Sequence, residues 1–149
     1  MTISVRAGSR VVSDRVAESV SLVDLRMRKM SAELLVPSFT APLTPTVAVE
    51  RSMSLTSGHV IYDVSYELSG VDSADTPVFA ASLTLNLVFR LAVGADLDRD
   101  DLRAFGSVSV LEVAHPYFRE IVHGLSGRMG LPPLVLQVAP PAEGSACRR

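Results

Sequence analysis

Apolar and polar residues alternate through the middle of the chain. Apolar residues occupy nearly every second position over residues 79–93, and the same alternation recurs over 59–69 and, in a shorter form, over 47–56. A period of two is typical of strands that bury one face and expose the other. The sequence therefore predicts three antiparallel strands, and a polar link over 70–77 joins the last two as a hairpin.

A fourth strand is predicted over residues 21–35, where the alternation slips by one position near Lys29 and Met30. A β-bulge accounts for such a slip, because one extra residue restores the apolar side chains to one face. The connection from this strand to the next contains three prolines, Pro37, Pro42 and Pro45. Proline donates no backbone hydrogen bond, so this connection is expected to be long and irregular.

After the last strand the period changes from two to that of a helix. Residues 96–105 predict a short helix with acidic residues in its first turn, and residues 107–128 predict a longer one. Pro116 suits a first-turn position or a bend, while Gly130 and the following Pro132-Pro133 stop the helix. The fold class is therefore α+β, with a four-stranded antiparallel sheet and a short and a long C-terminal helix packed on one face.

The longer helix has two apolar rows. The row expected to cover the sheet is Val113, Tyr117, Ile121, Leu125 and Met129. The neighbouring row, formed by Val110, Ala114, Phe118 and Val122, has no evident partner within the chain. This row and the small residue Gly124 are predicted to form an interface between subunits. The alternative is a broad helix–sheet contact within a single chain.

At 149 residues the chain suits one domain, predicted over 21–138, with a flexible or partly helical segment over 1–20 and a disordered tail over 139–149. Apolar residues make up 48% of the chain, and the mean hydropathy is +0.31, so some apolar surface is expected to contact a partner. A single cysteine, Cys147, excludes an intrachain disulfide. No stretch is apolar enough to span a bilayer, and a cytoplasmic location without membrane insertion is expected.

The sequence shows no motif with the residue types and spacing of a catalytic site or a cofactor site. The net charge is −2 with scattered basic residues, which argues against nucleic-acid binding. His115 and His123 lie eight positions apart, and a helical metal pair needs four. The acidic run that begins at Asp96 lacks the glycine and the final glutamate of a calcium loop. We therefore expect no enzyme, no metal and no cofactor.

The segment from Pro116 to Ile121, PYFREI, and the segment from Arg128 to Leu134, RMGLPPL, resemble the C-terminal signature of SecB-like export chaperones. The resemblance extends in pattern over roughly residues 20–138, as a strand, a crossover with prolines, three more strands and the helix. It implies a homotetramer, a dimer of dimers built around the main helices, that holds unfolded or pre-secretory polypeptides without ATP.

The resemblance leaves two roles open, protein export and protection of the antitoxin of a toxin–antitoxin pair. Export members engage the SecA ATPase through a further C-terminal helix, and residues 137–149 are too short and proline-rich to form one. Export members also present acidic residues on the outer surface of the sheet. Glu33 and Asp75 match these as SecA contacts, whereas Lys29 falls where an acid is expected.

A holdase needs an extended apolar groove. We expect Phe39, Pro42 and Leu43 of the crossover to form one wall of it, with Met27 and Met30 as adaptable contacts. The alternative is that Phe39 and the methionines simply fill the core. A different class of function, a small hydrophobic ligand bound between sheet and helix, would use polar groups from a separate set, Tyr62, Tyr66, Asn86 and His123.

Overall fold

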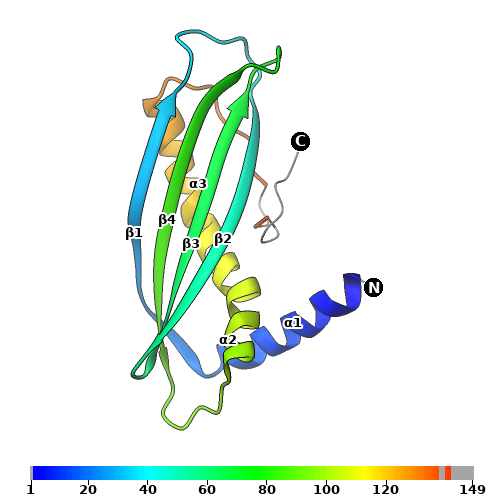
Figure 1. Ribbon diagram of the computed structural model, residues 1–149, viewed down its shortest axis with the longest axis vertical. Coiled ribbons are helices and arrows are strands. Elements are labelled where there is room, and N and C mark those ends of the chain that lie inside the picture. The colour runs from blue at the N-terminus through cyan, green and yellow to red at the C-terminus, as the bar shows by residue number, and fades with distance from the viewer. Residues whose placement is uncertain (1, 138–139, 142–149) are drawn as a thin grey trace.

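The computed structural model describes residues 2–137 and 140–141, with side chains from residue 8 onward. Its elements are α1 (Thr2–Ala17), β1 (Val20–Leu34), β2 (Thr44–Thr56), β3 (His59–Val71), β4 (Pro77–Leu91), α2 (Arg99–Phe105), the π-helical turn η1 (Gly106–Val110) and α3 (Leu111–Arg128). The strands form one sheet, and α3 runs along one of its faces (Figure 1). The predicted α+β class is confirmed. Apart from residues 140–141, the tail predicted over 139–149 lies outside the described residues.

The sheet is antiparallel, with the strand order β1-β4-β3-β2, so β1 and β2 are its edges. Gly58 closes the β2–β3 turn at a φ of 75°, a conformation that glycine adopts without a steric penalty. The irregular crossover, residues 35–43, carries the chain from one edge to the other. Pro45 was expected within that crossover, but it is the second residue of β2, where an edge strand tolerates the missing N–H.

The predicted bulge in β1 is confirmed, and the strand has a second one. The register against β4 shifts between Met27 and Lys29 and again between Leu22 and Asp24. Cross-strand partners share a face of the sheet, and Met27 and Met30 pair with the buried Leu85 and Leu83 of β4. The two bulges therefore keep the apolar residues of β1 on the inner face, defined here as the face that carries α3.

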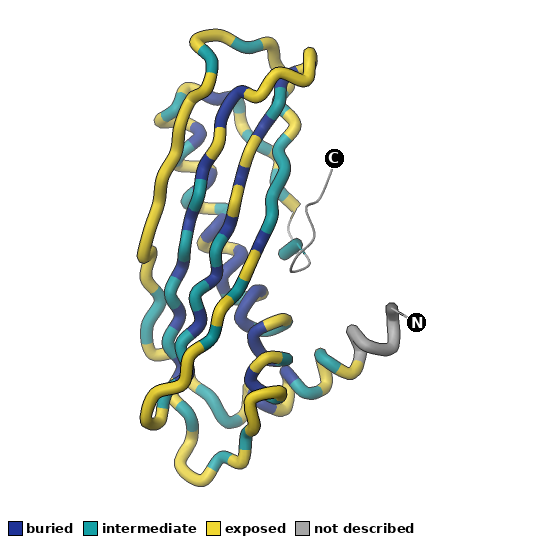
Figure 2. The backbone as a smooth tube through the Cα atoms, in the orientation of Figure 1, coloured by how far each residue is buried: buried dark blue, intermediate teal, exposed yellow. Residues whose placement is uncertain are grey.

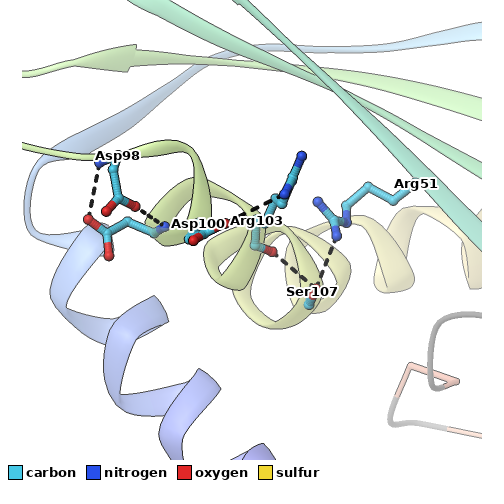
Figure 3. A network of polar contacts seen from close by, with 6 residues as sticks. Arg51, Asp98, Asp100, Arg103 and Ser107 are labelled. Atoms are coloured by element: carbon cyan, nitrogen blue, oxygen red, sulfur yellow. Dashed lines mark hydrogen bonds and ion pairs between the residues drawn. The ribbon is translucent and has the colours of Figure 1, made fainter.

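The helical run from α2 to α3 is continuous. Asp98 caps α2 by accepting from the backbone N–H of Asp101, whose carboxylate accepts from the backbone N–H of Asp98 in return (Figure 3). In the π-helical turn, Arg51 of β2 donates to Ser107 Oγ at 3.0 Å. A Cβ on Gly106 would overlap the side chains of Arg51 and Tyr62, so only glycine fits there.

Pro116 does not begin a helix as one interpretation of the sequence held, because it is the sixth residue of α3. It lies on the exposed side, where water can satisfy the backbone carbonyl that the ring leaves unpaired. Gly130, with a φ of 68°, ends the helix as predicted, and the N–H of Leu131 bonds to the carbonyl of Ser126 at 2.9 Å.

The row of α3 predicted to form a subunit interface is the one that the core buries most completely, while the row predicted to cover the sheet is partly buried at its edge. The residues predicted as a subunit interface, Val110, Ala114, Phe118 and Val122, are at most 4% exposed and belong to the core of the single chain. The ring of Phe118 stacks on Tyr66 of β3 with centroids 4.1 Å apart. That interface prediction is therefore wrong for these four residues, because the sheet already covers them. The other row has half-buried Ile121 and Leu125 and a Tyr117 that is 45% exposed.

The segment predicted as flexible or partly helical contains α1, which packs on α2 and η1 and projects to the side in Figure 1. Val16 is fully buried, and the hydroxyl of the buried Ser13 lies 2.6 Å from that of Ser109. Arg15 forms an ion pair with Asp101 at 2.6 Å. These contacts fix the C-terminal half of α1 to the helical run.

Candidate functional site

The inner face of β1 is apolar and largely open. Four of its residues, Leu22, Met27, Met30 and Leu34, are between 43% and 50% exposed, although their β4 partners are buried. Figure 2 shows β1 exposed along much of its length, while β3 and β4 alternate between buried and partly buried positions. An edge strand that exposes its apolar side has a surface available for another polypeptide.

The open side of α3 continues this apolar surface. Ile121 and Leu125 border a narrow cleft with Met30, and Tyr117 lies one turn earlier on the same row. We call the surface formed by Met27, Met30, Tyr117, Ile121 and Leu125 the trough. The cleft at its base has a volume of only about 10 Å³, so it is a crease between packed elements and has no room for a small ligand.

Gly124, predicted at the subunit interface, is exposed on the open side of α3. A Cβ built on Gly124 would have no heavy atom of the described residues within 4 Å, so the backbone is accessible there. The i, i+3 spacing places Gly124 beside Ile121 and therefore next to the trough. Of the five predicted interface residues, only Gly124 is thus available to a second copy.

The structure does not bring the five residues predicted to bind unfolded chains into one described groove. Met27 and Met30 are exposed on β1, whereas Phe39 and Leu43 are half-buried against the core within the crossover, and Pro42 is exposed. The N–H of Ser73 donates to the carbonyl of Thr40 at 3.4 Å and so ties the crossover to the β3–β4 turn. The methionines and the crossover are therefore two separate surfaces.

The outer face of the sheet is polar. Asp63 of β3 accepts from Asn86 of β4 at 2.8 Å and pairs with Arg28 of β1, which sits at the bulge between Met27 and Lys29. Glu33 and Asp75, the predicted SecA contacts, are both exposed; Glu33 pairs with Ala80 near the end of β1, and Asp75 lies in the β3–β4 turn. Both acids are therefore accessible at the same end of the sheet.

The other flank of α3 is covered by the chain itself. Residues Leu131–Gln137, here called the strap, come after α3 and run back along it in an extended conformation. Leu131 is buried, and Leu134 and Leu136 pack partly buried against the core. Between the strap and α3 lies an open groove of about 500 Å³ bordered by Pro116, Arg119, Glu120, Val122, His123 and the strap residues 134–136.

The only buried histidine among the described residues joins the strap to α3. His115 is 3% exposed, and its Nε2 lies 2.7 Å from the backbone carbonyl oxygen of Gln137. A carbonyl oxygen only accepts, so Nε2 carries the proton and donates it to this bond. Burial lowers the pKa of His115, the nearby Arg119 lowers it further, and the bond to Gln137 opposes both. The neutral imidazole is therefore the form that the fold favours.

This preference predicts a loss of stability in mild acid. An unfolded histidine takes up a proton near its ordinary pKa of 6.5, and the folded chain does so only at lower pH, so the free energy of unfolding should fall as pH drops below 6.5. The slope for one proton is at most about 1.4 kcal/mol per pH unit. Urea titrations of the wild type and His115→Gln, which keeps a side-chain donor but does not titrate, should diverge in this range. Parallel curves would contradict the assignment.

The polar groups predicted for a small-ligand site do not converge. The hydroxyl of Tyr62 donates to the carbonyl of Leu102 at 2.7 Å, Tyr66 is buried under Phe118, and Asn86 bonds to Asp63 on the outer face. His123 is exposed on the strap side of α3. Burial raises the pKa of Tyr66, in line with a packing role.

Two further features bear on the class of site. Within residues 2–137 and 140–141, no three His, Cys, Asp or Glu side chains gather closely enough to hold a metal ion. None of the helices in this part of the chain combines the length and the apolar character that crossing a membrane requires.

Comparison with known proteins finds the same fold in a solved structure. The SecB-like chaperone Rv1957 of Mycobacterium tuberculosis, in complex with a ChAD peptide from the HigA1 antitoxin Rv1956, superposes with a TM-score of 0.76 over 85% of this chain and 95% of that chain, at 23% identity. A protein of unknown function from Streptococcus agalactiae aligns at 13% identity with a TM-score of 0.31, covering 79% of this chain and 96% of that chain; this score carries no structural argument. No protein-family model and no curated protein matches the chain.

Proposed function

We propose that this chain, which has the SecB-like fold, is a cytoplasmic holdase chaperone that binds unfolded polypeptides without ATP and catalyses no reaction. The observation that carries the proposal is the apolar trough that the folded chain leaves open along β1 and α3. A monomeric protein rarely exposes a contiguous surface of this kind unless it binds another protein or a membrane there.

The first occupant of this surface is a second copy of the chain. The trough combines an apolar strand side, an open helix row and the edge of β1, which among the described residues pairs with β4 alone. Two copies related by a two-fold axis can bury such a surface against itself, because a two-fold interface uses the same patch twice. We therefore assign the predicted assembly, a homotetramer formed as a dimer of dimers, to the trough and Gly124 in place of the buried row.

The second occupant is an unfolded chain. Once assembly covers Met27 and Met30, the crossover residues Phe39, Pro42 and Leu43 remain as the apolar contacts for it. A buried apolar side chain contributes about 1.5–3 kcal/mol, and association alone costs about 4–15 kcal/mol, so useful affinity requires several contacts along one extended segment. A folded protein is stable by about 5–15 kcal/mol. A passive binder must therefore capture its clients before they fold.

The decisive experiment measures chaperone action and size together. A test protein diluted from denaturant should scatter less light in the presence of the purified chain, with no change on adding ATP, and native mass spectrometry should report a tetramer. Bovine serum albumin at the same mass concentration controls for crowding. A monomer that leaves aggregation unchanged would contradict the proposal.

The partner is an unfolded antitoxin, by analogy with the structural neighbour, whose bound peptide comes from one. Affinity purification from the native host would separate this role from protein export. Recovery of the antitoxin of a toxin–antitoxin pair supports the first role, and recovery of preproteins with signal peptides supports the second. In the second case Glu33 and Asp75 become the candidate contacts for SecA, and charge reversal at both should abolish its binding without changing the tetramer.

A further inference from the structure

The strap lies on α3 in the way that an extended peptide lies on a receptor. Its side chains alternate: Leu134 and Leu136 face the core and are half-buried, while Pro133 is exposed and Val135 is 87% exposed. This alternation is that of an extended chain with one side against a surface. The strap therefore packs two apolar side chains against the core and exposes its opposite side to solvent.

The strap is held along its backbone by few contacts. Among the described residues, no backbone-to-backbone hydrogen bond joins residues 132–137 to the sheet or to a helix. At the start of the strap, the N–H of Leu131 donates to the carbonyl of Ser126 at the end of α3. At its far end, His115 Nε2 donates to the carbonyl of Gln137. A carbonyl oxygen is present in every residue, so His115 recognises an extended backbone without regard to sequence.

The strap does not fill the surface on which it lies. The groove of about 500 Å³ beside it opens to solvent and is bordered by the apolar residues Pro116, Val122 and Leu134 and by the polar residues Arg119, Glu120 and His123. A groove with both apolar and polar borders suits a polypeptide segment that buries alternate side chains and keeps its backbone hydrated.

We infer that this flank of α3 is a binding surface for an extended apolar segment, that the strap occupies it in cis, and that a bound client segment displaces the strap and takes over the hydrogen bond from His115. The inference rests on the proposed function, because the displacing segment is that of an unfolded client. The client then has two contact surfaces, the crossover and the flank of α3 that the strap covers in the free chain. Competition of this kind lowers the apparent client affinity by the fraction of chains whose strap is open.

A weakened strap should bind clients more tightly. Leu134→Ser/Leu136→Ser removes the two inserted side chains, and Val11→Ser/Val93→Ser removes two apolar side chains of equal or greater exposure elsewhere. The probe is fluorescein-labelled, reduced and carboxymethylated ribonuclease A, followed by fluorescence anisotropy. The strap variant should bind about three- to tenfold more tightly than the wild type, and the control variant should bind like the wild type. Equal or weaker binding by a strap variant with wild-type circular dichroism would overturn the inference.

A second measurement leaves the strap attached. The chain contains no tryptophan, so Leu134→Trp introduces a single tryptophan, which can be excited selectively, at a half-buried strap position. Saturation with unlabelled carboxymethylated ribonuclease A, which also lacks tryptophan, should shift the emission to longer wavelength as the strap enters water. An unchanged emission at saturation contradicts displacement. If no variant binds the probe, the proposed function fails with the inference; if all bind it equally, only the inference fails.

Discussion

Replacing Phe118 with alanine is expected to destabilise the folded chain by about 3–5 kcal/mol. The side chain is 1% exposed, lies at the centre of the helix–sheet contact and stacks on Tyr66. Its removal leaves a cavity that the long strands cannot close, because β3 is paired on both sides. Since small domains are stable by about 5–15 kcal/mol in total, this one change removes a large part of the stability.

Urea denaturation followed by circular dichroism measures this loss. Tyr117→Ala is the matched control, since it removes an aromatic ring from the adjacent position of α3 where the side chain is 45% exposed. It should cost less than about 1 kcal/mol when both variants are compared at a concentration where the wild type is monomeric. A Phe118→Ala variant as stable as Tyr117→Ala would mean that Phe118 does not occupy the core.

Replacing Met30 with aspartate is expected to dissociate the assembly. Met30 is 44% exposed in the single chain and borders the trough, so the chain folds with the substitution but would bury a carboxylate against its copy. An unpaired buried charge costs several kcal/mol, and a two-fold interface contains the substitution twice. The dissociation constant should rise at least about a thousandfold, which corresponds to about 4 kcal/mol.

Analytical ultracentrifugation over a range of concentrations tests the dissociation. Ser31→Asp is the control, because it places the same charge on the next residue of β1, on the outer face. The control should retain the wild-type mass. A Met30→Asp variant that stays assembled but no longer binds unfolded protein would place Met30 on the client surface, as the sequence analysis proposed, and would contradict its place in the interface.

The strands could be predicted from the sequence because their information is local. In β3 and β4 the period of two is complete, and the predicted spans agree with the observed ones to within a few residues. The bulge between Met27 and Lys29 could also be predicted, because a slip of one position in the apolar alternation indicates one extra residue in the strand. The resemblance to SecB-like chaperones, carried by residues 116–121 and 128–134, correctly indicated the fold.

The row of α3 that contacts the sheet could not be predicted in the same way. The buried row, Val110, Ala114, Phe118 and Val122, is as apolar as the row that begins at Val113. The two rows are offset by one residue, which is a rotation of about 100° around the helix axis. The docking of the helix selects between them through the π-helical turn at Gly106, which adds a residue to the turn and rotates α3 about its axis.

The sequence by itself determined the elements, their order and the surplus of apolar residues, because each is written in a local pattern of side chains. Only the tertiary structure decided which apolar residues are left over. The sheet covers one row of α3, the strap covers one flank, and Met27 and Met30 stay open because β1 extends along an edge that nothing in the described chain covers. Burial is a property of contacts between distant segments, and no local pattern records it.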